Sequence, residues 1–154
     1  MGSGAVARSD EMGSPDLTLV ATHARMIGAG GRLSSEEAVL EANERFYQAF
    51  NLKDVAMMDG AWAAEHAVTC VHPGWNVLEG RAEVLDSWHS ILGNPNQPRI
   101  VTGGATASVF GDIAVVVCRE LVAGSPLVAT NVFVLEGGDW KLLHHQSGPV
   151  YAQG

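Results

Sequence analysis

The feature that most constrains the fold is a change in hydrophobic period near residue 99. Upstream, apolar residues recur at helical spacing. Downstream they alternate along four segments, 100–110, 113–123, 127–136 and 140–150. The links between these segments are short and rich in glycine, which is typical of antiparallel hairpins. Helices followed by a long antiparallel meander predict an α+β fold with the helices packed on one face of the sheet.

Three helices are expected upstream of the meander. Ser34 and Glu37 match a capping box, and the helix they start should run to about Leu52. Asp54 can cap a second helix, and Gly80 opens a third. Residues 1–33 are rich in Gly, Ala and Ser, so we interpret them as a poorly ordered extension and place the domain at residues 34–154.

Composition excludes several classes of partner. The formal net charge of −8 argues against nucleic acid, because phosphate binding needs a basic face. No apolar stretch approaches the roughly 20 residues that span a bilayer, and no signal peptide is expected. Cys70 and Cys118 make no disulfide framework, and free thiols in an acidic domain predict a cytoplasmic protein.

The clearest chemical signal is a short strand near residues 68–71 that ends in Cys70-Val-His72-Pro-Gly-Trp75. Cys70 and His72 share one strand face. A metal would need three or four converging ligands, and buried cysteines usually behave as small hydrophobes, so we predict no metal and no cofactor here. A Cys–His nucleophile pair is the less favoured alternative. His72 suits a general base or a ligand contact, or else a side chain that stabilises the turn beside Pro73.

Side-chain alternation can be carried through the hairpins to predict one face of the sheet. Pairing Val122 with Leu127 and Glu136 with Asp139 gathers a set that is apolar at one end and polar at the other, as in a ligand cavity: Val116, Cys118, Glu120, Asn131, Phe133, Leu142, His144 and Gln146. We expect Glu120 at the solvated rim. A three-residue turn at 137–139 would put His145 in the place of His144.

Several motifs together carry a resemblance: Phe46-Tyr-Gln-Ala-Phe50, Asp54 to Trp62, Cys70 to Gly74, Gly80-Arg81, Thr130 to Phe133 and Trp140 to His145. In this order they resemble the nuclear transport factor 2-like superfamily, especially its SnoaL-like branch and the association domain of calcium/calmodulin-dependent kinase II. The resemblance covers about residues 35–151. It implies a cone-shaped, cystatin-like fold, in which a curved sheet encloses a pocket and the outer sheet face forms dimers.

Ketosteroid isomerase belongs to the same superfamily, and its site can be compared by motif. Its first-helix Tyr falls at Phe46, with Tyr47 adjacent, its Asp base near Cys70 and its oxyanion-hole Asp near Asn131. Its two further pocket tyrosines fall at Trp62 and Trp88. Because Cys70 replaces the Asp base, we do not expect ordinary ketosteroid isomerase activity. The Asp-Arg-Asp set of the superfamily's epoxide hydrolase is not matched either.

Two functions follow as expectations. The first is a homodimeric domain that binds a small apolar or aromatic molecule. If it is an enzyme, it would be a cofactor-free isomerase, cyclase or dehydratase acting on a cyclic substrate. His72 or His144 would move the proton and Asn131 would steady the oxygen. The ligand contacts would be Phe46, Tyr47, Trp62, Cys70, Trp75, Trp88, Cys118 and Phe133.

The second function is a non-catalytic association domain with a vestigial pocket. Its interface would be the outer sheet face, carried by Val115, Val117, Val128, Val132 and Val134. An apolar outer face suits oligomerisation under either reading.

Overall fold

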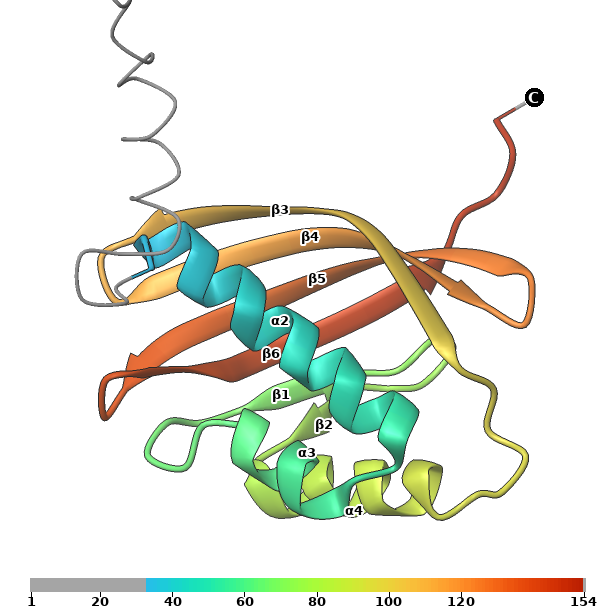
Figure 1. Cartoon of the computed structure of the whole chain (residues 1–154). Coiled ribbons are helices and arrows are strands. Elements are labelled where there is room, and N and C mark those ends of the chain that lie inside the picture. Colours follow the sequence, from blue (N-terminus) through green and yellow to red (C-terminus); the bar gives the residue numbers. More distant parts are fainter. Residues whose placement is uncertain (1–32, 154) are drawn as a thin grey trace, which may run out of the picture. The chain divides into compact units, whose positions relative to one another are not determined.

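The computed structural model describes residues 33–153 as three helices packed on a curved six-stranded sheet (Figure 1). The helices are α2 (Ser35–Leu52), α3 (Val55–Ala61) and α4 (Arg81–Leu92). The strands are β1 (Thr69–Val71), β2 (Leu78–Glu79), β3 (Ile100–Phe110), β4 (Ile113–Val122), β5 (Ser125–Glu136) and β6 (Asp139–Pro149). Their order is β2-β1-β6-β5-β4-β3, with only β1 and β6 parallel. The predicted α+β class and mainly antiparallel meander are confirmed.

Two predictions concern the N-terminal extension and the absence of a membrane-spanning segment. The extension predicted over residues 1–33 lies outside the described residues, apart from Leu33. Within the described part, no helix is long and apolar enough to cross a membrane.

Helix α2 begins where the capping box predicts. The Ser34 hydroxyl accepts the Glu37 N–H at 3.2 Å, and the Glu37 carboxylate accepts the Ser34 N–H at 2.8 Å. The helix ends at Leu52, and the next residue, Lys53, takes the left-handed conformation of a C-cap with φ of 55°. Asp54 then caps α3 by accepting the Met57 N–H at 2.9 Å. Local capping chemistry therefore sets both helix boundaries.

We expect Ser34→Ala to lower the free energy of unfolding by about 1 kcal/mol, because it removes one half of the capping box. Urea denaturation measures this as a lower midpoint with an unchanged slope. Ser90→Ala is the matched control, since Ser90 lies exposed within α4. Equal losses in both variants would contradict a specific role for the cap.

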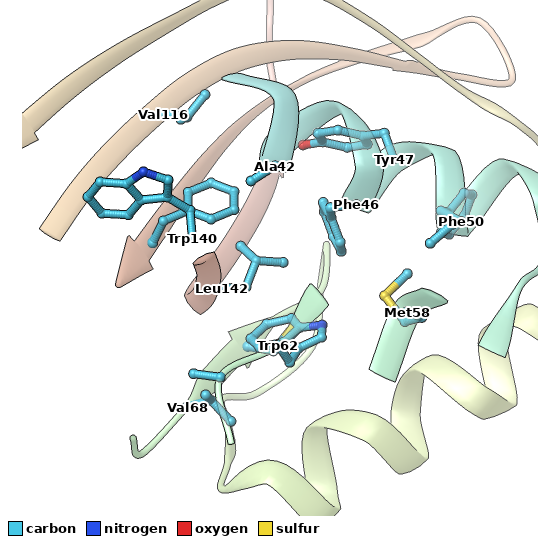
Figure 2. Packing of buried hydrophobic residues seen from close by; sticks show 14 of the residues in the cluster. Ala42, Phe46, Tyr47, Phe50, Met58, Trp62, Val68, Val116, Trp140 and Leu142 are labelled. Atoms are coloured by element: carbon cyan, nitrogen blue, oxygen red, sulfur yellow. The ribbon is translucent and has the colours of Figure 1, made fainter. Parts of the chain in front are cut away.

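The hydrophobic core lies between the helices and the inner face of the sheet. Figure 2 shows Phe46 projecting from α2 toward Trp62, with Met58 and Leu142 nearby. The Phe46 ring lies edge-on to the rings of Trp88 and Trp62, with centroids 5.3 Å and 6.4 Å away. Edge-to-face aromatic packing of this kind adds to the energy of area burial.

Arg81, the first residue of α4, anchors the segment between α3 and β1. Its guanidinium donates hydrogen bonds to the carbonyl oxygens of Asp59, Trp62 and Ala63, each at 2.9 Å. A planar fork with five N–H donors suits three converging carbonyls. This contact fixes the chain that leads through β1 to His72.

The β4–β5 hairpin differs in register from the prediction. Val122 pairs with Ser125, not with Leu127, around a two-residue turn at Ala123-Gly124. Both turn residues have positive φ, 48° and 81°, which is the geometry that fits the twist of a tight hairpin. The register moves by two residues, so side chains keep their predicted face.

The β5–β6 hairpin has the predicted turn but carries an unpredicted bulge. Glu136 pairs with Asp139, as expected. The register then shifts between Val132 and Phe133, which pair with His144 and Leu142 and leave Leu143 as the extra residue. A bulge reverses the alternation beyond it. The expectation that His144 faces the cavity is therefore wrong, and His145 takes that place opposite Asn131.

One member of the predicted outer face is also misplaced. Val117 and Val128 are exposed at 42% and 40%, as that prediction requires. Val134, however, is buried together with its neighbour Phe133. Both lie beside the bulge, where a strand pair twists more strongly, and that local twist accounts for the burial of two consecutive side chains.

Candidate functional site

A cavity of about 220 Å³ opens where the ends of β4 and β6 meet α4 and the turn after β1. Its apolar wall includes Phe50, Trp75 and Trp88, and its polar end is formed by Glu120, His145 and Ser147. A few polar groups facing an aromatic wall is the usual make-up of a small-molecule site.

A second, larger hollow lies between α2 and β3, with a volume of about 560 Å³. Its lining is mainly charged and polar, with Glu41, Arg45 and Arg99 among the side chains. Without an apolar wall it lacks the composition of a small-molecule site, so the smaller cavity is the better candidate.

Glu120 is the charged group of the cavity and is only 4% exposed. Tyr47, from α2, donates its hydroxyl proton to Oε1 of Glu120 at 2.6 Å. Ser147, from β6, donates to the other carboxylate oxygen. We expected Glu120 at the solvated rim, and this was wrong, because hydroxyls from two other elements meet the carboxylate inside the fold. Burial of a charged group needs such hydrogen bonds.

Asn131 connects this carboxylate cluster to His145. Its side-chain oxygen accepts from Nδ1 of His145 at 2.5 Å. Its amide nitrogen donates to Oδ1 of Asn43 at 2.7 Å and to the Tyr47 hydroxyl at 3.1 Å. Both amide protons are therefore committed within the protein. Asn131 therefore has no free N–H with which to stabilise a ligand oxygen, the role that we expected of it.

The two buried imidazoles are neutral near pH 7. Burial lowers the pKa of His145 to about 3, with smaller contributions from His72 and His144. Burial also lowers the pKa of His72 to about 4. The Ser87 hydroxyl donates to the Val84 carbonyl at 2.7 Å, so it accepts from Nε2 of His72 at 2.9 Å. Since a neutral imidazole carries one proton, Nδ1 of His72 and Nε2 of His145 are acceptors.

The thiols of the site are poor nucleophiles. Burial raises the pKa of Cys70 to about 12 and also raises the pKa of Cys118. The nearest imidazole contact, from Cys70 Sγ to His72 Nε2, is 3.9 Å. A thiolate–imidazolium pair would need the opposite pKa shifts on both partners, so the arrangement does not support the Cys–His nucleophile pair. Among residues 33–153, no three His, Cys, Asp or Glu side chains converge as a metal site would require.

The structure brings some of the predicted site residues together and separates others. His72, Trp75 and Trp88 line the cavity. Tyr47, Cys118 and Asn131 lie behind its polar end, where Tyr47 is 3.3 Å from the Cys118 sulfur. The remaining predicted contacts are core residues and do not line the cavity: Phe46, Trp62, Cys70 and Phe133.

His144 lies outside the cavity. Its Nδ1 is 2.6 Å from the Thr69 hydroxyl on the neighbouring strand β1. Sequence reasoning missed two polar residues of the network, Asn43 and Ser147, and offered His145 only as the alternative to His144. His145 and Ser147 share a strand face, so knowledge of the bulge at Leu143 would have found both.

The comparisons with known proteins agree with this fold. The sequence profile of the SnoaL-like domain family matches residues 39–152. Because that match spans most of the chain, the protein belongs to the SnoaL-like domain family. The F-box protein SKIP8 of Arabidopsis thaliana is 24% identical over 116 residues, which are 74% of this chain and 50% of that protein. The chain thus spans about half the length of this curated relative.

Solved structures place the fold among nuclear transport factor 2-like proteins. A candidate dehydratase of that family from Streptomyces avermitilis is 36% identical, with a TM-score of 0.71, covering 75% of this chain and 96% of that one. A candidate calcium/calmodulin-dependent protein kinase type II association domain from Thiobacillus denitrificans is 27% identical, with a TM-score of 0.65, covering 71% and 93%. The predicted superfamily is therefore confirmed.

Proposed function

We propose that this chain is a small-molecule-binding domain whose ligand occupies the cavity between Trp88 and Glu120. The observation that carries the proposal is a buried carboxylate, hydrogen-bonded by Tyr47 and Ser147, at the end of an aromatic cavity. A buried charge is costly in a core that has only to pack, whereas a ligand site needs polar groups at fixed positions. The free thiols further support a reducing compartment such as the cytoplasm.

If the domain is catalytic, we propose cofactor-free acid–base chemistry of the isomerase or lyase type. The Glu120 carboxylate is the main proton acceptor, and the neutral imidazoles of His72 and His145 are secondary acceptors. His144 has no part in this scheme, because it lies outside the cavity. The similarity to a candidate dehydratase favours this chemistry.

Protein-detected NMR with a set of small aromatic fragments tests the binding proposal. We expect shift changes to cluster on cavity residues and Trp75→Ala to weaken binding several-fold, because Trp75 is 49% exposed and contributes a face of the wall. Phe110→Ala is the matched control, since Phe110 is 66% exposed at the other end of β3. Shifts confined to other surfaces, or equal losses in both variants, would contradict the proposal.

The alternative function is an association domain, and the outer sheet face favours it. Val101, Val117, Leu121 and Val128 lie on this face and are exposed at 62%, 42%, 44% and 40%. Apolar side chains grouped in this way are typical of an interface. The similarity to a kinase association domain supports the same use. We propose a homodimer through this face, which is compatible with either function.

Sedimentation analysis tests the interface. We expect the wild-type chain to sediment as a dimer and Val117→Glu to sediment as a monomer, because a charge cannot be buried unpaired in an apolar contact. Leu52→Glu, at an exposed position at the end of α2, is the matched control and should stay dimeric. A monomeric wild-type protein would contradict the proposed homodimer.

A further inference from the structure

Among residues 33–153, no positively charged side chain pairs with Glu120. Its two hydrogen bonds come from neutral hydroxyls, those of Tyr47 and Ser147. No Lys or Arg lies among the described residues that line the cavity. The same negative charge, after burial itself, raises the pKa of the Tyr47 phenol far above its usual range. A buried carboxylate is normally paired with a cation, so this site is electrostatically incomplete.

The hydrogen-bond donors at the polar end are all used within the protein. The hydroxyls of Tyr47 and Ser147 donate to Glu120, both amide protons of Asn131 are committed, and Nδ1 of His145 donates to Asn131. What remains at this end of the cavity is a set of acceptors. They are the spare lone pairs of the Glu120 carboxylate and Nε2 of His145.

Three other side-chain donors belong to residues on the cavity lining, and none changes the balance at the buried polar end. The indole N–H of Trp75 belongs to a side chain that is 49% exposed on the apolar wall. The indole N–H of Trp88 has no partner among the described residues, but the nitrogen is buried and does not reach the open space. The Gln97 amide is half-buried at the edge and carries an acceptor as well as donors. The buried polar end therefore selects a ligand that donates hydrogen bonds.

The walls next to this end suit an organic cation. The His72 ring packs against two indoles of the wall in T-shaped pairs, with ring centroids 4.7 Å from that of Trp75 and 4.6 Å from that of Trp88. Indole faces attract ammonium groups more strongly than other aromatic faces do. The formal net charge of −8 also favours the approach of cations over anions.

We propose that the cavity binds an arylalkylamine in its ammonium form, with the ammonium N–H groups donated to Glu120 and the flat ring placed against Trp75 and Trp88. The assignment rests on the proposed function, since it names the class of ligand for the same cavity. It excludes carboxylates and other anions, which would meet a like charge and a wall of acceptors.

Isothermal titration calorimetry with three matched indoles tests the assignment. Tryptamine, tryptophol and indole-3-propionate share one ring and end in an ammonium, a hydroxyl and a carboxylate. We expect tryptamine to bind about tenfold tighter than tryptophol, and indole-3-propionate to give no measurable binding. Equal affinity for all three, or preference for the carboxylate, would overturn the assignment and leave the cavity as a ligand site. Binding by none of them would overturn the proposed function itself.

Glu120→Gln sharpens the test. Gln keeps the shape and can still accept one hydroxyl proton while removing the charge, so the preference for tryptamine over tryptophol should disappear. Asp86→Asn is the matched control, because it removes the same charge from an exposed position on α4 that does not line the cavity. Retained preference in Glu120→Gln, or its loss in Asp86→Asn, would overturn the role of Glu120. The three-ligand comparison on the wild-type chain decides the question even if Glu120→Gln fails to fold.

Discussion

Phe46→Ala should lower the free energy of unfolding by about 3–5 kcal/mol, the largest effect expected of any single substitution considered for this chain. Phe46 is 1% exposed, and its ring lies within 5.3 Å of the Trp88 ring and 5.1 Å of the His145 ring, measured between centroids. Removing it leaves a cavity where α2, α4 and β6 meet. The surrounding rings are rigid and can refill that space only in part.

Chemical denaturation of the variant and two controls measures this effect. Phe46→Leu keeps most of the volume and should lose distinctly less. Leu52→Ala removes a large side chain from the same helix at a position that is 61% exposed, and should change stability by no more than about 0.5 kcal/mol. A loss below about 1 kcal/mol in Phe46→Ala would mean that the aromatic cluster does not hold α2 on the sheet.

Acidification from pH 7 to pH 5 should destabilise the domain by about 2 kcal/mol for each buried imidazole. The pKa of His145 is lowered to about 3 and that of His72 to about 4, against 6.5 in the unfolded chain. Below pH 6.5 the two imidazoles are therefore protonated in the unfolded state but stay neutral in the folded state. Stability is fully present above pH 6.5 and falls with pH until the folded-state values are reached.

Thermal unfolding at several pH values between 5 and 7.5 measures this slope. His145→Gln keeps a donor for Asn131 but removes the titrating group, so its melting temperature should fall less steeply below pH 6.5. His72→Gln should remove the second contribution. The other titratable groups packed around the imidazoles are His144, Tyr47, Cys70 and Glu120. An unchanged slope in both variants would contradict the assignment to His72 and His145.

Much of the fold was predictable because it depends on sequence patterns that span only a few residues. The capping box at Ser34, the helical spacing before residue 99 and the glycine links between strands each act over a few residues. The inward faces of β4 and β5 were also predictable. A register error of two residues does not change which face a side chain occupies, so Cys118, Glu120 and Asn131 were assigned correctly.

The polar end of the site was not predictable to the same extent, for two physical reasons. The bulge at Leu143 has no strong local signal, yet it exchanges His144 for His145 and brings Ser147 inside. The burial of Glu120 depends on Tyr47 from a helix 73 positions earlier in the chain. Alternation along a strand predicts a face, whereas the solvation of a side chain on that face depends on distant elements that cover it.

The central claim is that the cavity between Trp88 and Glu120 is a ligand site, and a crystal structure of the chain soaked with its tightest-binding aromatic fragment tests it most directly. The account predicts the fragment's ring against Trp75 and Trp88, with a donor atom about 3 Å from a Glu120 oxygen. A cavity filled by the protein's own side chains, with the fragment bound only on the outer face of the sheet, would contradict it.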